Sequence, residues 1–91
     1  MQIKEKARAG TLESGDVLVT VQPWEGLELT LESPVKAQFG DQILDLARKV
    51  LDREGIESGR ISLEDQGALD CTIQARLTTA LRRAREKGGD L

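Results

Sequence analysis

Short stretches of the chain alternate between apolar and polar residues. Residues 17–21 place three valines on one side of an extended backbone, and residues 27–32 alternate leucine with glutamate and threonine. A period of two is typical of strands that bury one face, and it also predicts a strand over residues 60–64. Residues 4–12 are expected to form a first strand, although alanine and glycine make them poor strand formers. Since short connections join the first three strands, we expect them to be antiparallel.

Two further stretches carry apolar residues at intervals of three and four, the spacing of an amphipathic helix. The first starts at Ser33 and Pro34, two residue types favoured at a helix N-terminus, and ends before Gly55. The second helix follows residues 65–67. The expected buried stripes are Val35, Phe39, Ile43, Leu46, Ala47 and Val50 in the first helix, and Leu69, Ile73, Leu77, Ala80, Leu81 and Ala84 in the second.

The element order β-β-β-α-β-α predicts an α+β fold with two layers, in which an antiparallel sheet of about four strands is covered by two helices. A chain of 91 residues can bury a modest core without a metal or disulfides. We therefore expect residues 1–91 to form a single domain.

The composition argues against several classes of function. The formal net charge is −3 and Trp24 and Phe39 are the only aromatic residues, so nucleic acid is not expected as a partner. The chain has no histidine and a single cysteine, which removes the commonest general base, the commonest metal ligand and any internal disulfide. We therefore expect no metal site and no catalysis by the chain itself. With no signal peptide and no apolar stretch of membrane-spanning length, it is expected in the cytoplasm, away from membranes.

The stretch over residues 10–16, Gly-Thr-Leu-Glu-Ser-Gly-Asp, contains the most informative candidate. Ser14 and Gly15 form a turn dipeptide between two predicted strands, which places Ser14 at the tip of a hairpin. A loop of only these two residues would set Gly10 opposite Val19 and Glu13 opposite Asp16, an unfavourable pair of like charges. A wider loop would separate the two carboxylates.

Two interpretations of Ser14 remain open at this point. Serine and glycine are ordinary turn residues, and a plain turn explains them. Alternatively, the hydroxyl is presented for modification by another enzyme, because a loop tip is accessible and the chain has no histidine to activate a nucleophile. In the second case Ser14 is a substrate and not a catalyst.

Three other features are weaker candidates. Cys71 lies away from the apolar stripe of the second helix, and nothing in the sequence indicates a lowered thiol pKa. The basic run Arg82, Arg83, Arg85 and Lys87 suits a helix C-terminus, and its functional alternative is docking onto an acidic partner or onto phosphates. Trp24, in a turn, is either an anchor for a partner or a cover for the sheet edge.

Four segments together carry a resemblance to a known family. Residues 9–17, 38–41, 67–71 and 75–77 look like the acyl carrier (gamma) subunit of citrate lyase, and the match extends from about residue 3 to residue 85. The resemblance implies that Ser14, flanked by Glu13, Gly15 and Asp16, carries a triphosphoribosyl-dephospho-coenzyme A group through a phosphodiester. It also implies a non-catalytic phosphoprotein that takes part in citrate fermentation.

The resemblance further implies a set of partners. A holo-carrier transferase would attach the group, and an acetate-activating ligase would acetylate its thiol. The carrier would then move acetyl and citryl thioesters between the citrate lyase alpha subunit, an acyl and CoA transferase, and the beta subunit, the lyase. Two alternatives are the acyl carrier of malonate decarboxylase and a small α+β interaction or regulatory subunit with an unmodified turn.

Overall fold

The strands and helices of the computed structural model follow the hydrophobic periodicity closely. The structure describes residues 2–85, and every second residue is buried in two of the strands. The element order β-β-β-α-β-α is confirmed. The elements are β1 (Ala7–Gly10), β2 (Val17–Gln22), β3 (Leu27–Glu32), α1 (Lys36–Arg53), β4 (Gly59–Asp65) and α2 (Asp70–Arg85).

The four strands form one mixed sheet in the order β1-β2-β4-β3. β2 pairs antiparallel with β1 and with β4, whereas β3 and β4 are parallel. The prediction of a wholly antiparallel sheet was therefore wrong for one pair of strands. The physical reason is the connection, because a chain that leaves β3 and returns through α1 re-enters the sheet in its original direction. β4 is thereby inserted between β2 and β3.

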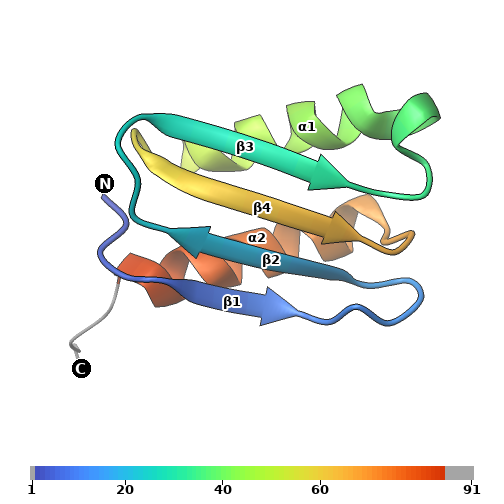
Figure 1. Ribbon diagram of the computed structural model, residues 1–91, viewed down its shortest axis with the longest axis horizontal. Helices are drawn as coiled ribbons and strands as arrows, with labels where there is room; N and C mark the ends of the chain where they lie inside the picture. Colours follow the sequence, from blue (N-terminus) through green and yellow to red (C-terminus); the bar gives the residue numbers. More distant parts are fainter. Residues whose placement is uncertain (1, 86–91) are drawn as a thin grey trace.

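Both helices cover the same face of the sheet, so the molecule has the expected two layers (Figure 1). The valines of β2 and the apolar residues of β4 point into the space between sheet and helices, where α2 also packs. Full burial of each such side chain contributes about 1.5–3 kcal/mol. The largest fully buried apolar side chains are Leu51, Ile61, Leu63, Ile73, Leu77, Leu81, Val17, Val19, Val21 and Val50.

The predicted apolar stripes are correct in the middle of each helix and wrong at its beginning. Helix α1 starts at Lys36 because residues 33–35 form a separate turn, in which Lys36 N–H donates to the carbonyl oxygen of Ser33 at 3.2 Å. Phe39 in α1 is 47% exposed, and Leu69, just before α2, is 71% exposed. The start of α1 extends past the end of β3 and Leu69 precedes α2, so neither side chain packs against the core (Figure 1).

The connections gather at two opposite ends of a molecule that measures 37 Å along its longest axis (Figure 1). One end contains residues 11–16, the turn before α1 and the N-terminus of α2, because β1, β3 and β4 all run towards it. We call it the Ser14 end. The C-terminal turns of both helices lie at the other end, which we call the arginine end.

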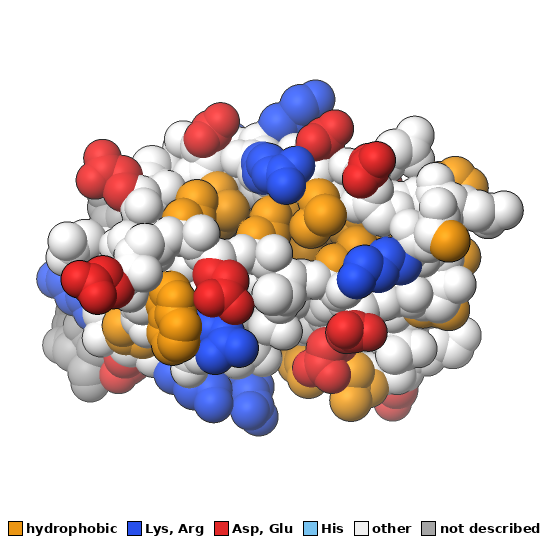
Figure 2. Space-filling model, turned by 45° about the horizontal axis from the view of Figure 1, so that its top comes forward, with side chains coloured by type: hydrophobic (Ala, Val, Ile, Leu, Met, Phe, Trp, Pro, Cys, Tyr) orange, Lys and Arg blue, Asp and Glu red, His pale blue; other side chains and the backbone are white. Residues whose placement is uncertain are grey.

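Hydrophobic side chains also line a groove between β3 and α1, with charged side chains on both sides (Figure 2). β3 is an edge strand, and its Leu27 is 50% exposed although the alternation predicted an inward position. A pocket of about 350 Å³ lies in this groove. Among the described residues, no helix is long and apolar enough to cross a membrane.

Candidate functional site

The connection between β1 and β2 is the wider of the two loops that the sequence left open. Ala9, and not Gly10, lies opposite Val19, so the register is displaced by one residue and the loop spans residues 11–16. Gly10 explains the difference. Its φ of 96° is unfavourable for other residues, and a Cβ atom here would clash with the carbonyl oxygen of Val17. The chain therefore leaves strand β1 at Gly10, where its backbone passes close to the carbonyl group of Val17 in β2.

A tight turn at the tip of the loop presents Ser14. Asp16 N–H donates to the carbonyl oxygen of Glu13 at 3.0 Å, and Gly15, the third residue of this turn, has a φ of 85°. A positive φ at that position is what a type II turn requires. Ser14 is exposed at the second position. Glu13 and Asp16 are thus the first and last residues of one turn, and the cross-strand pair of like charges that a two-residue loop would create does not form.

Backbone hydrogen bonds fix this turn to the end of β4. Gly15 N–H donates to the carbonyl oxygen of Gln66 at 2.7 Å, and Gln66 N–H donates back to the carbonyl oxygen of Asp16 at 2.8 Å. The two bonds continue the antiparallel pairing of β2 with β4 by one step beyond Val17 and Asp65. A loop held in this way has few alternative conformations, so the position of Ser14 is set by the sheet.

The side chain of Asp16 ties the loop to helix α2. Arg76 donates to both carboxylate oxygens, from Nε to Oδ1 and from Nη2 to Oδ2, each at 3.0 Å. Thr11 Oγ1 donates to Oδ2 at 2.8 Å, and Val17 N–H donates to Oδ1 at 2.7 Å. These bonds, led by those from Arg76, lower the pKa of Asp16 from 3.8 to about 2. Asp16 is therefore a paired, structural carboxylate.

The two hydroxyl groups of the loop differ in their hydrogen bonding. Besides donating to Asp16, Thr11 Oγ1 accepts a hydrogen bond from Glu13 N–H at 3.1 Å. The Ser14 hydroxyl has no hydrogen-bond partner among residues 2–85. Ser14 thus presents the free hydroxyl of the loop, and Thr11 the engaged one.

A buried carboxylate lies behind the loop and was missed from the sequence. Asp65 is only 1% exposed, accepts a hydrogen bond from Ser33 Oγ at 2.8 Å and another from Ala68 N–H at 2.9 Å. It therefore joins the turns that precede α1 and α2. The alternation that points Ile61 and Leu63 inwards also points Asp65 inwards, so the pattern contained the information.

Three large exposed apolar side chains of the described residues lie at the Ser14 end. Leu12 is 54% exposed, and Phe39 and Leu69 project from the same end of the molecule. A pocket of about 370 Å³, with Phe39 and Ala68 among its lining residues, opens between the starts of the two helices. Large exposed apolar residues that gather at one place are typical of a contact surface for another protein.

The remaining candidates from the sequence lie elsewhere. Cys71 is exposed on α2, and nowhere between residues 2 and 85 do acidic or cysteine side chains gather as a metal site. Trp24 is 45% exposed at the arginine end, and the Arg60 guanidinium lies 4.8 Å from the centre of its ring. Lys87 falls outside the described residues.

Chemically, the arrangement can offer a hydroxyl but cannot activate it. The Asp16 carboxylate of the same turn is held by Arg76, and its low pKa makes it a poor base. The chain has no histidine. An external enzyme would have to supply the base for any reaction at Ser14.

Known proteins that resemble this chain come from citrate lyase and from malonate decarboxylase. A family model described as the malonate decarboxylase delta subunit matches residues 4–84. The citrate lyase acyl carrier protein of Treponema denticola is 53% identical over 87 residues, which are 96% of this chain and the whole of that protein. The proteins of the same name from Haemophilus influenzae and Streptococcus equi are 48% and 49% identical, over 96% and 92% of this chain and 92% and 84% of theirs.

A solved structure agrees in fold. A chain in the crystal structure of a Pseudomonas malonate decarboxylase hetero-tetramer in complex with malonate superposes with a TM-score of 0.80, covering 90% of this chain and 86% of that one. The sequence identity is 20%, so this likeness shows the fold alone.

Proposed function

Since the chain belongs to the family of citrate lyase acyl carrier proteins, we propose that it is the acyl carrier subunit of a citrate lyase and that Ser14 is its attachment point for a prosthetic group. Such a subunit holds an acyl group for other subunits and performs no catalytic step itself. The proposal depends on how well the residues around Ser14 suit such a group.

The observation that supports Ser14 most strongly is its free, exposed hydroxyl at the tip of a fixed turn. Thr11 offers the other hydroxyl of the loop, but both its donor and its acceptor capacity are in use. A transferase that reaches into the loop would therefore meet Ser14 Oγ without first breaking a hydrogen bond within the described chain. Gly15 supports this exposure, because it has no side chain to shield the serine and adopts the positive φ of the turn.

Attachment is a group transfer in which the carrier is the acceptor. Ser14 Oγ forms an ester bond with a phosphorus atom of the donor, the bond from phosphorus to the leaving group breaks, and the hydroxyl proton passes to a base. The carrier has no suitable base, so the holo-carrier transferase supplies it. In keeping with the family, we propose triphosphoribosyl-dephospho-coenzyme A as the group, which would supply a terminal thiol for the acyl group.

The rest of the loop fixes where this tether begins. The two backbone bonds to Gln66 and the ion pair between Asp16 and Arg76 prevent the loop from folding back over the sheet. A tether with a fixed origin keeps its end at a high effective concentration near a docked active site. The proposed partners are the alpha and beta subunits of the lyase, the holo-carrier transferase and the acetate-activating ligase.

The test is the intact mass of the protein after co-expression with the enzymes that build and attach the group. We expect a mass increase in the unchanged protein, none in Ser14→Ala, and a retained increase in Thr11→Val, which removes the other hydroxyl of the loop. A Treponema denticola carrier in the same cells serves as the positive control. An increase in Ser14→Ala, or none in the unchanged protein while the control is modified, would refute the proposal.

A second candidate, the acyl carrier of malonate decarboxylase, is favoured by the description of the family model and by the fold of the solved relative. The sequence identities favour citrate lyase, because acyl carrier proteins of that name from three organisms are 48–53% identical to this chain. Reconstitution distinguishes the two. The modified protein should restore citrate cleavage to alpha and beta subunits that lack a carrier, and it should not restore malonate decarboxylation to the corresponding decarboxylase subunits.

A further inference from the structure

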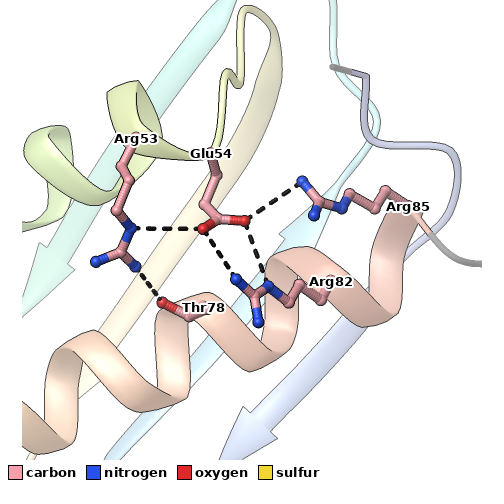
Figure 3. Close-up of polar contacts among 5 residues, drawn as sticks. All are labelled: Arg53, Glu54, Thr78, Arg82 and Arg85. Carbon is pink, nitrogen blue, oxygen red and sulfur yellow. Dashed lines mark hydrogen bonds and ion pairs between the residues drawn. The ribbon is translucent and has the colours of Figure 1, made fainter.

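Three arginines converge on one glutamate at the end of the molecule opposite Ser14 (Figure 3). The Glu54 carboxylate lies 3.5 Å from Arg53 Nε, 3.4 Å from Arg82 Nη2 and 3.3 Å from Arg85 Nη1. Arg53 is the last residue of helix α1, whereas Arg82 and Arg85 come from the last turns of α2. We call these four residues the arginine cluster.

The cluster contains more positive charge than its carboxylate can balance. Burial by itself would raise the pKa of Glu54, whose side chain is only 5% exposed, but the Arg82 hydrogen bond and the three guanidinium charges leave this pKa below 4.5. One ionised carboxylate offsets one arginine. The side chains of Arg53 and Arg82 remain 54% and 55% exposed, so their excess charge faces solvent.

This excess contrasts with the other end of the molecule. Carboxylates outnumber cations around Ser14, where Arg76 is already paired with Asp16. The acidic residues that the strand ends, turns and helix starts bring to the Ser14 end are Glu13, Asp16, Glu32, Asp41, Glu64, Asp65 and Asp70. The chain as a whole has a formal net charge of −3, and Glu5, Asp52 and Glu57 also lie at the arginine end, so the unbalanced positive charge is limited to the cluster itself.

We propose that the arginine cluster docks the carrier onto an acidic protein surface of the lyase assembly and leaves the Ser14 end free to face the active sites. The inference rests on the proposed function only in its choice of partner. Guanidinium groups are planar and bind carboxylates through two parallel hydrogen bonds, and arginine is enriched in protein interfaces. Arg53 Nη2 already donates to Thr78 Oγ1 at 2.8 Å, and Arg82 uses Nε and Nη2 on Glu54 (Figure 3). A partner would therefore bind the remaining N–H groups of these two half-exposed side chains.

A protein partner fits this surface better than a polyanion does. A nucleic acid or a membrane presents negative charge over a wide area and would also meet the carboxylates of Glu5, Asp52 and Glu57 at the arginine end, which would repel it. The tether proposed at Ser14 starts at the opposite end of a molecule that is 37 Å long, so its phosphates are not the natural occupants. An acidic patch on a protein can be limited to the width of one end.

The test compares two double variants that each remove two positive charges, so that the net charge changes equally in both. Arg53→Gln with Arg82→Gln neutralises the exposed part of the cluster and leaves Arg85 to pair with Glu54. The matched control is Arg48→Gln with Lys49→Gln, which removes two exposed cations from the middle of α1. A third variant, Arg53→Lys with Arg82→Lys, keeps the charge and loses the planar groups. Urea unfolding confirms that each variant folds.

The measurement is the affinity of each protein for the purified alpha and beta subunits of its own citrate lyase, at several salt concentrations. We expect the glutamine pair in the cluster to weaken binding by about tenfold and to reduce its salt dependence, because each lost charge pair at an interface affects both. The control pair should change the affinity by less than about twofold. The lysine pair should retain the salt dependence.

Other outcomes would overturn the proposal. Equal losses in the cluster and control pairs would show a response to net charge alone, and unchanged binding in the cluster pair would show that it is not part of the interface. If the unchanged protein binds anionic lipid vesicles or double-stranded DNA more tightly than it binds the subunits, the partner of the cluster is a membrane or a nucleic acid and not a protein. The intact mass of each variant is recorded in parallel, so a failure of modification at Ser14 and a failure of docking are separate results.

Discussion

A carboxylate is held by arginine at each end of the sheet, but the number of arginines for each carboxylate differs between the two ends. At the Ser14 end, Asp16 and Arg76 pair one to one through two hydrogen bonds, and the loop closes around them. At the arginine end, Glu54 faces three arginines. The first arrangement fixes a backbone turn, and its two charges balance each other. The second joins the ends of two helices and leaves positive charge on the surface, so the same pairing chemistry fixes a turn beside Ser14 at one end and leaves charge for the proposed docking at the other.

The largest effect on stability is expected from Gly10→Ala at the Ser14 end. A Cβ atom there combines an unfavourable positive φ with a clash against the Val17 carbonyl oxygen, which should lower the free energy of unfolding by more than about 3 kcal/mol. The matched control is Gly15→Ala, since Gly15 also has a positive φ but open space around it. It should cost about 1 kcal/mol. Equal losses in urea unfolding would show that the close crossing at Gly10 is unimportant.

Glu54→Gln should have the largest effect at the arginine end. The substitution keeps the shape of the side chain and removes the charge that holds three arginines together, so we expect a loss of about 2 kcal/mol in urea unfolding. Raised salt should reduce the loss by screening the arginines from one another. A loss below about 0.5 kcal/mol, the range of ordinary surface substitutions, would mean that the cluster contributes only to docking.

Asp16→Asn tests the ion pair between Asp16 and Arg76 at the Ser14 end through the pH dependence of stability. The pKa of Asp16 is lowered from 3.8 to about 2 in the folded protein, so its contribution is complete above about pH 4 and is lost as the pH falls towards 2. The asparagine variant should therefore be less stable at pH 7 and should lose less stability than the unchanged protein between pH 4 and 2. Parallel pH curves for the two proteins would contradict the ion pair.

The smallest effect is expected from Arg48→Ala, between the two ends. Its pair with Asp45 is formed by side chains that are 61% and 68% exposed. Such a pair contributes less than about 0.5 kcal/mol, and thermal unfolding should barely change. A larger loss would show that arginine contacts on this protein are strong wherever they occur, which would remove the contrast between its two ends.

The sequence predicted the elements better than it predicted their pairing. Alternating valines and leucines placed β2 and β4 within one or two residues, because a half-buried strand leaves a pattern with a period of two. No local pattern records that β4 enters between β2 and β3 or that it runs parallel to β3. The stripes misplaced Phe39 and Leu69 because a helical period does not show where the covering strand ends.

For the site, the sequence predicted an exposed Ser14 and a turn with Gly15, but not the contacts that hold them. Arg76 is 60 residues away from Asp16 in sequence, and only the folded chain brings them together. The displaced register had a local cause in Gly10, whose positive φ could not be inferred from a glycine alone. Arg53 and Glu54 likewise meet the arginines of α2 only after the two helices pack.

The most direct test of the central claim is to locate the added group within the modified protein. Cleavage at Arg8 and Lys36 yields a peptide of residues 9–36 that contains Ser14 together with Thr11, Thr20, Thr30 and Ser33. Fragment mass spectrometry of this peptide should place the whole added mass on Ser14. Fragments that place it on Thr11 or on any other residue would contradict the assignment of Ser14 as the attachment point.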